Sequence, residues 1–167
     1  MRRVCYQVAV SLDGFIAGPD DAADWIPMDP DIDFTALFDR FDTVLMGRRT
    51  YETAGSMGAG KGVIVASKTL DPATHPSVTV VGDGLFDRIA ALKSEPGKDI
   101  WLFGGGSLFR SLLAAGLVDT VEPAVVPVLL GGGIPFLPEP AARTRLELTG
   151  HRVFAKTGIV LLEYAVR

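Results

Sequence analysis

The fold of this chain can be inferred outward from one stretch, Asp99-Ile100-Trp101-Leu102-Phe103-Gly104-Gly105-Gly106-Ser107-Leu108-Phe109. An apolar run ends in three glycines, and leucines then recur at positions 108, 112 and 113 with helical spacing. This order predicts a strand, a tight turn and a helix. Glycine lets an anion approach the backbone amides, and the positive N-terminus of the following helix attracts it further. The stretch therefore favours a phosphate-binding turn over an ordinary connection between a strand and a helix.

The glycines do not complete either of the common nucleotide-binding motifs. A Rossmann fingerprint requires its third glycine where this chain has Phe109. The segment Gly60-Lys61-Gly62 lacks the Ser or Thr of a P-loop, and it precedes a strand instead of following one. The sequence thus indicates phosphate binding without identifying the cofactor.

Length and composition indicate a single folded domain that spans residues 1–167. The chain has 167 residues, of which 48% are hydrophobic and 22% are charged, as in ordinary globular proteins. Its net charge is -4 and its basic tracts are no longer than the pairs Arg2-Arg3 and Arg48-Arg49, which argues against nucleic acid or an anionic membrane as a partner. No apolar segment approaches the ~20 residues of a membrane span.

Cysteine and histidine usage adds two expectations. The single cysteine, Cys5, excludes an internal disulfide and is typical of a reducing compartment, so we expect a cytoplasmic protein. The two histidines, His75 and His151, lie far apart and show no metal-ligand spacing, so no metal site is predicted.

Eight β-rich runs and four helical patterns predict the secondary structure. The runs cover residues 4–10, 43–46, 63–66, 78–81, 99–103, 118–130, 145–154 and 159–166. The first helix is expected to be capped by Asp29 and to begin at Pro30. A glycine-rich loop is expected at residues 56–62. Strands that alternate with helices predict an α/β domain with a mainly parallel sheet and an antiparallel end.

Two prolines, Pro123 and Pro127, interrupt the run at residues 118–130. Because proline cannot donate to a sheet ladder, we expect an edge, a bulge or a bend there.

Polar or cationic residues follow three of the predicted strands, at residues 47–50, 67–69 and 104–107. Ligands of open α/β sheets bind outside the carboxyl ends of the strands, so three such patches suit a ligand with several phosphates, such as a dinucleotide. A second glycine triplet at 131–133 is followed by Ile134-Pro135, which does not begin a helix. We therefore interpret it as a loop without a phosphate site.

Four motifs, in order, resemble the dihydrofolate reductase superfamily over nearly the whole chain. They are Ser11-Leu12-Asp13-Gly14-Phe15-Ile16-Ala17, Val44-Leu45-Met46-Gly47-Arg48-Arg49-Thr50-Tyr51-Glu52, Phe103-Gly104-Gly105-Gly106-Ser107-Leu108-Phe109 and Pro127-Val128-Leu129-Leu130-Gly131-Gly132-Gly133. The chain looks closest to the branch that includes the reductase domain of the bifunctional riboflavin-biosynthesis deaminase/reductase. The resemblance implies a three-layer α/β/α fold with a mixed, mostly parallel eight-stranded sheet and four helices. It also implies NADPH as the cofactor.

The same resemblance implies a set of cofactor-binding residues. It places Ala9 and Ile16 near the nicotinamide, and Ser67 and Lys68 near the adenosine 2′-phosphate. The residues that it places at the phosphates are Gly47, Arg48, Arg49 and Thr50, together with the turn formed by Phe103, Gly104, Gly105, Gly106, Ser107 and Leu108. A cis peptide bond is expected between Gly104 and Gly105.

A catalytic acid is also implied. Alignment without gaps from Met46-Gly47-Arg48 places Asp31 where folate reductases carry their substrate-binding carboxylate. Asp31 is expected in the first turn of the first helix, facing the nicotinamide, where it supplies the proton directly or through a water. Asp29 and Asp33 remain the alternative carboxylates, and helix capping is the competing structural role.

We therefore expect an NADPH-dependent reductase of a small heterocyclic substrate, of the 5-amino-6-(5-phosphoribosylamino)uracil reductase type. A dihydrofolate or pterin reductase and an NADPH-binding protein without turnover remain the alternatives. The riboflavin branch further suggests a homodimer, with residues 121–130 or the terminal strands at the interface.

Overall fold

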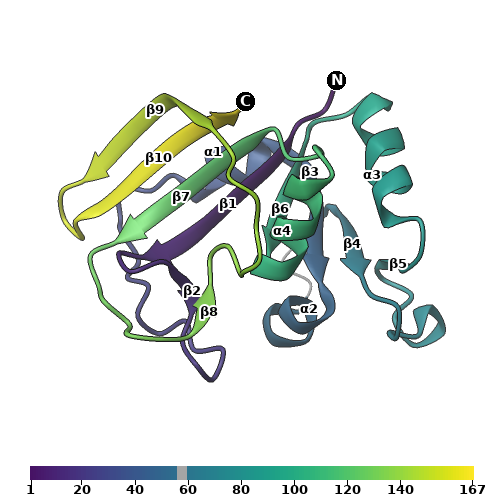
Figure 1. Cartoon of the computed structure of the whole chain (residues 1–167), viewed down its shortest axis with the longest axis horizontal. Helices are drawn as coiled ribbons and strands as arrows, with labels where there is room; N and C mark the ends of the chain where they lie inside the picture. Colours follow the sequence, from purple (N-terminus) through teal and green to yellow (C-terminus); the bar gives the residue numbers. More distant parts are fainter. Residues whose placement is uncertain (56–59) are drawn as a thin grey trace.

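The computed structural model describes residues 1–55 and 60–167, so part of the expected glycine-rich loop, 56–59, lies outside the described residues. The strands are β1 (Val4–Ser11), β2 (Phe15–Ala17), β3 (Phe41–Gly47), β4 (Gly62–Ala66), β5 (Thr79–Val81), β6 (Asp99–Gly104), β7 (Thr120–Val126), β8 (Ile134–Pro135), β9 (Leu146–Phe154) and β10 (Ile159–Val166). The helices are α1 (Phe34–Asp39), α2 (Arg48–Ala54), α3 (Leu85–Ser94) and α4 (Gly106–Ala114), with a short 3₁₀ turn, η1 (Pro72–Thr74). Figure 1 shows their arrangement.

One eight-stranded sheet organises the molecule, in the order β5-β4-β3-β6-β1-β7-β10-β9. The pairs from β5 to β7 are parallel, whereas β10 runs antiparallel to both β7 and β9. Two short strands, β2 and β8, form a separate antiparallel pair. The predicted α/β class, with a mostly parallel sheet, an antiparallel end and four helices, is confirmed.

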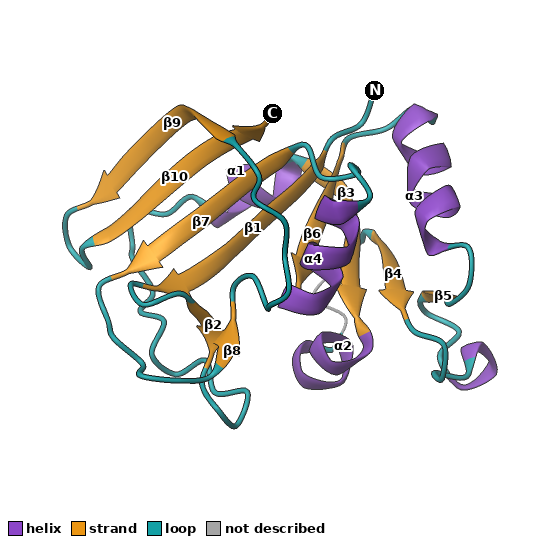
Figure 2. Ribbon diagram, in the orientation of Figure 1, coloured by secondary structure: helices purple, strands orange, loops and turns teal. Residues whose placement is uncertain are grey.

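Helices cover both faces of this sheet, which makes three layers (Figure 2). One core cluster joins Tyr6 and Leu102 to α3 and α4 through Ile89 and Phe109. The opposite cluster joins Val44 and Trp101 to side chains of α1 and α2. The central strands are buried on both faces, which explains why their sequences are nearly continuous apolar runs.

The proline-containing strand β7 is not an edge strand, because β1 and β10 flank it on either side. Its pairs with β10 skip Glu122 and Pro123, but the register is the same on either side of this gap; the register shift between Glu163 and Tyr164 of β10 is in the pairing with β9. The pairing of β7 is therefore locally incomplete at the proline, but its register continues unchanged, so the expected bulge is absent from β7. The expected sheet edge at this segment is wrong, since the gap in the pairing accommodates the missing N–H of Pro123 inside the sheet.

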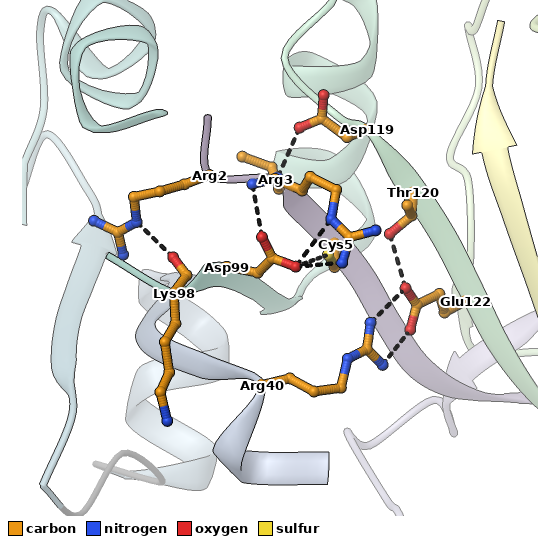
Figure 3. A network of polar contacts seen from close by, with 10 residues as sticks. Arg2, Arg3, Cys5, Arg40, Lys98, Asp99, Asp119, Thr120 and Glu122 are labelled. Carbon is orange, nitrogen blue, oxygen red and sulfur yellow. Dashed lines mark hydrogen bonds and ion pairs between the residues drawn. The ribbon is translucent and has the colours of Figure 1, made fainter. Parts of the chain in front are cut away.

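A polar network holds the amino ends of β1, β6 and β7 together (Figure 3). Arg40 donates two hydrogen bonds, of 2.8 and 2.9 Å, to the Glu122 carboxylate, and the Thr120 hydroxyl donates a third to the same group. Arg3 pairs with Asp99 at 2.6 Å. Burial raises the pKa of the Cys5 thiol to about 11, which keeps it neutral beside these charges. The network satisfies its own members and lies at the end of the strands opposite their carboxyl ends.

Candidate active site

A cavity of about 770 Å³ extends over the sheet face that carries α1 and α2 and past the carboxyl ends of β3 and β6. Its walls come from β1, β2, α1, α2, β6, α4, β7, β8 and the β9–β10 hairpin. This volume suits a bound molecule of cofactor size, since ligand pockets usually span about 300–1,000 Å³. We describe its end at α2 and α4 as the cradle end and its end at β9 and β10 as the hairpin end.

The glycine turn after β6 forms the floor of the cradle end. Gly104 has φ +156°, and the peptide bond between Gly104 and Gly105 is cis, as predicted. Gly105 precedes α4 and no side chain caps this helix, whose first N–H groups have no acceptor within the helix. The residues from Phe103 to Leu108 all line the cavity. The turn can therefore offer backbone donors to an anion.

The second predicted phosphate patch meets this turn across the cavity. The Thr50 side chain packs beside Gly104 and Gly105, since a Cβ built at either glycine would lie 3.5–3.6 Å from its hydroxyl oxygen. Gly47, Arg48, Arg49 and Thr50 all line the cavity. Arg49 pairs with Asp21 at 2.9 Å and Arg48 with Glu52 at 2.7 Å, and these pairs are exposed enough for an anion to compete with them.

The third predicted patch lies outside the cavity wall. The Ser67 hydroxyl oxygen accepts hydrogen bonds from the N–H groups of Thr69 and Leu70, so it stabilises its own turn. Lys68 is exposed and pairs with Asp83 at 2.8 Å. One link to the cradle end remains, because Arg48 donates to Thr69 at 2.6 Å. Ser67 and Lys68 themselves do not line the cavity, and the hydrogen bond between Arg48 and Thr69 is what connects their turn to the other two patches.

The predicted nicotinamide neighbours, Ala9 and Ile16, both line the middle of the cavity. Ala9 pairs with Ala124 of β7, and these two methyl groups leave space above the sheet where larger side chains would fill it. A flat ring could therefore lie on this part of the sheet.

Asp31 does not occupy the position predicted for it. Helix α1 begins only at Phe34, and Asp33 is its N-cap, accepting a hydrogen bond from the N–H of Ala36 at 2.9 Å. Asp31 is exposed, pairs with Lys156 at 2.9 Å and is not among the lining residues, whereas Asp33 is. The expectation that Asp31 lies in the first turn and faces the cavity is therefore wrong.

The cause of this shift is Asp29, which was expected to cap the helix. Asp29 is buried and accepts hydrogen bonds from the hydroxyl of Thr157, at 2.6 Å, and from the N–H of Asp31, at 2.9 Å. The Thr157 hydrogen bond lowers the pKa of this carboxyl group. Because Asp29 ties the segment to the β9–β10 turn, the chain makes an extra turn before the helix begins.

Several cavity residues were not predicted from the sequence. Gln7 lies two residues before Ala9 on the same strand face, so strand alternation was a usable signal for it. Arg152, Phe154 and Leu161 come from the terminal hairpin, which the motifs did not connect with the site. Arg152 donates to the carbonyl of Asp31 at 3.3 Å and lies over the Phe154 ring at 4.7 Å. It is a cation at the otherwise apolar hairpin end.

Residues 1–55 and 60–167 contain neither a membrane-spanning helix nor a metal-binding cluster. No helix there is both long and apolar enough to cross a membrane. No group of histidine, cysteine and acidic side chains in those residues is arranged to hold a metal ion.

A curated relative resembles this chain over almost its full length. YyaP of Bacillus subtilis (strain 168), an uncharacterized protein, is 33% identical over 179 residues, which cover 98% of this chain and 94% of that protein.

Two solved structures share the fold. A protein of Shewanella sp. PV-4, provisionally named a riboflavin biosynthesis protein, has a TM-score of 0.83 at 27% identity, covering 100% of this chain and 99% of that one. Dihydrofolate reductase from Enterococcus faecalis, complexed with NADP(H), has a TM-score of 0.68 at 18% identity, covering 98% of this chain and 94% of that one. At that identity the second likeness shows the fold alone.

The family model of the RibD C-terminal domain matches residues 2–161. The resemblance to the riboflavin branch that was inferred from the four motifs is thereby confirmed, and the fold is shared with dihydrofolate reductase. The chain belongs to the RibD C-terminal domain family.

Proposed function

We propose that this protein is an NADPH-dependent reductase of a small heterocycle, of the 5-amino-6-(5-phosphoribosylamino)uracil reductase type. The observation that carries the proposal is the meeting of the glycine turn with Arg48 and Arg49 at one end of a largely apolar cavity. Such a cavity suits a molecule with phosphates at one end and a flat ring at the other. Membership of the RibD C-terminal domain family and the likeness to an NADP(H)-bound reductase support it further.

Different parts of the cavity would hold the phosphates, the nicotinamide and the substrate ring. The backbone donors of Gly104–Ser107 and the two arginines would hold the phosphates. Ala9 and Ile16 would form a small, apolar floor for the nicotinamide and exclude water from it. When bound, NADPH supplies a hydride from its nicotinamide ring. Apolar side chains of the hairpin end would hold the ring that receives it.

A proton must accompany the hydride, and we assign its delivery to Asp33 in place of Asp31. Asp33 lines the cavity, whereas Asp31 lies outside the cavity wall in an ion pair with Lys156. Asp33→Asn keeps the helix cap, because Asn caps as well as Asp, but it cannot supply a proton. We expect turnover to fall about 10²-fold or more, with little change in NADPH affinity. Asp31→Asn is the matched control and should retain turnover within about twofold; the reverse result would return the role to Asp31.

The test of the function is NADPH oxidation measured against dihydrofolate, pterins and the deaminated riboflavin pyrimidine. Turnover with the riboflavin pyrimidine supports the proposal. Turnover with dihydrofolate or a pterin alone would favour the folate-type alternative. NADPH binding without oxidation of any of these would favour a cofactor-binding protein without turnover.

We assign the preference for NADPH over NADH to Ser67 and Lys68, whose turn lies outside the cavity next to Arg48. A cation and a hydroxyl suit the extra 2′-phosphate, although Lys68 must first leave Asp83. Lys68→Ala should weaken NADPH binding by about 1–3 kcal/mol and leave NADH binding nearly unchanged. Equal affinity of the wild type for both cofactors would contradict this assignment.

We further propose a cytoplasmic homodimer. Leu148 and Val153 of the edge strand β9 are 53% and 61% exposed, an apolar surface that a second copy could cover. Within residues 121–130, Val121 and Val126 are buried in the chain, so Leu129, which is 70% exposed, is the apolar side chain that this segment would offer to such an interface. Light scattering at micromolar concentration should give twice the chain mass of 17.8 kDa; a single species at 17.8 kDa would contradict the dimer.

A further inference from the structure

One side chain in the cavity wall has an unsatisfied polar atom. Within residues 1–55 and 60–167, the Oε1 atom of Gln7 is the one buried side-chain oxygen or nitrogen without a hydrogen-bond partner. Gln7 is 9% exposed and lines the cavity. A buried acceptor without a donor costs free energy, and native structures rarely retain one without reason. Gln7 therefore needs a partner that the chain itself does not provide.

The neighbours of Gln7 explain why the protein leaves it unpaired. The indole N–H of Trp101 donates to the backbone carbonyl of Gln7 at 2.9 Å, so it is not available to the side chain. Glu122, its register partner on β7, is a carboxylate that accepts from Arg40 and Thr120 and has no hydrogen to donate to Gln7 Oε1. The remaining surroundings are aromatic, because Trp101 packs against Phe38 and Phe103 with ring centroids 5.4 and 5.0 Å apart.

All three aromatic rings also line the cavity. A planar ligand that lies against these rings would meet apolar surface there and a polar group at the Gln7 carboxamide. The carboxamide presents one acceptor and two donors in a plane, and its last torsion is soft, so it can rotate to expose either edge. A lactam, with adjacent N–H and C=O, is a group that satisfies both kinds of site at once.

We propose that Gln7 is a specificity-determining residue that recognises the lactam edge of the heterocyclic substrate. The inference rests on the proposed function and adds the feature by which the substrate ring is selected. A neutral amide in an aromatic setting favours a neutral polar edge over a carboxylate or a phosphate. The cations of the cavity lie elsewhere, at the cradle end and at Arg152.

The experiment compares two fluorescent probes, lumazine and 1,3-dimethyllumazine, whose difference is the methylation of both lactam nitrogens. Dissociation constants are measured with the wild type and with Gln7→Met, which keeps the length of the side chain and removes its hydrogen bonds. Each titration is run with and without NADP⁺. NADPH affinity and the thermal unfolding of the ligand-free proteins are measured alongside.

The wild type should bind lumazine at least tenfold more tightly than the dimethyl probe. Gln7→Met should bind lumazine about tenfold more weakly than the wild type does. Its dissociation constants for the dimethyl probe and for NADPH should stay within twofold of the wild-type values, and it should unfold at no lower temperature than the wild type. The inference is overturned if both probes weaken equally, if the wild type does not discriminate or binds neither probe, or if NADPH affinity falls instead. If the wild-type protein does not bind NADPH, the proposed function is contradicted. The comparison of the two probes without cofactor still tests the role of Gln7 in that case.

Discussion

The two glycine triplets of this chain, Gly104–Gly106 and Gly131–Gly133, have the same sequence and different surroundings. The first ends β6 and leads into α4, and its backbone donors face the cavity. In the second, the N–H of Gly131 already donates to the carboxylate of Asp13 at 2.7 Å, and the N–H of Leu130 donates to it at 3.0 Å. The second triplet thus binds an anion of its own chain, whereas the first is the one to which we assign the phosphates of a bound cofactor.

The two triplets are also physically coupled. The segment that follows the second triplet packs against the first, because a Cβ at Gly106 would overlap the carbonyl of Pro135 and touch Pro138. The residues after a triplet therefore decide its role. Ser107-Leu108 begins a helix, whereas Ile134-Pro135 forms β8 and covers the start of that helix.

The largest effect is expected from Gly106→Ala. The added methyl group meets backbone, which cannot move aside as a flexible side chain could. We expect a loss of about 1–3 kcal/mol in the free energy of unfolding, together with weaker NADPH binding as the start of α4 shifts. Urea unfolding and NADPH titration measure the two effects. A variant as stable as the wild type would show that the triplets are not coupled.

Gly105→Ala should separate binding from folding. A Cβ there would lie 3.5 Å from Thr50, an ordinary contact, so the fold can accept it. The methyl group would instead stand where a phosphate approaches the backbone. We expect NADPH affinity to fall at least tenfold, or about 1.4 kcal/mol, with the urea midpoint almost unchanged. Unchanged NADPH affinity would move the phosphate site away from this turn.

Asp13→Asn tests the internal anion of the second triplet. Hydrogen bonds from the Ser11 hydroxyl and from the N–H groups of Gly131 and Leu130 lower the pKa of Asp13 to about 2. Its carboxylate therefore stabilises the folded state above about pH 4, the ordinary range for aspartate, and this contribution is lost as the pH falls toward 2. The urea midpoint of Asp13→Asn should lie below that of the wild type at pH 7. The gap should close between about pH 4 and pH 2; a gap that does not vary with pH would exclude the carboxylate as its cause.

Gly132→Ala should have the smallest effect and serves as the control for all three. Nothing lies within 4 Å of a Cβ at this position, and Gly132 is not among the glycines with positive φ. Stability should stay within about 0.5 kcal/mol, as for most surface changes, and NADPH affinity should be unaltered. A clear loss of NADPH binding would mean that the second triplet also contacts the cofactor.

The sequence predicted the sheet and the cradle end because local patterns encode them. The strand runs, the glycine turn after Phe103 and the polar residues after Met46 are read within short windows. Parallel strands then bring their carboxyl ends together without further information.

The positions of Asp31 and Gln7 depend on contacts that no window contains. Asp31 is displaced by the hydrogen bond of Asp29 to Thr157, 128 residues away. Gln7 is exceptional only because the neighbouring indole N–H that could have satisfied it bonds elsewhere. Arg152 reaches the cavity from an edge strand whose pattern is mostly exposed. These residues could be placed only once the fold was known.

The central strand β1 has a consequence for how the chain folds. It pairs with β6 and β7, and its first residue, Val4, is the register partner of Ile100 and donates to the Asp119 carboxylate, 115 positions along the chain. Both edges of this apolar strand therefore stay unpaired until β6 and β7, which come later in the sequence, have been synthesised and folded. Such non-local pairing slows folding and lengthens the time during which the strand can associate with other chains. Refolding yield should therefore fall as protein concentration rises, and substitutions in β1 should change the rate of folding more than those in the late hairpin.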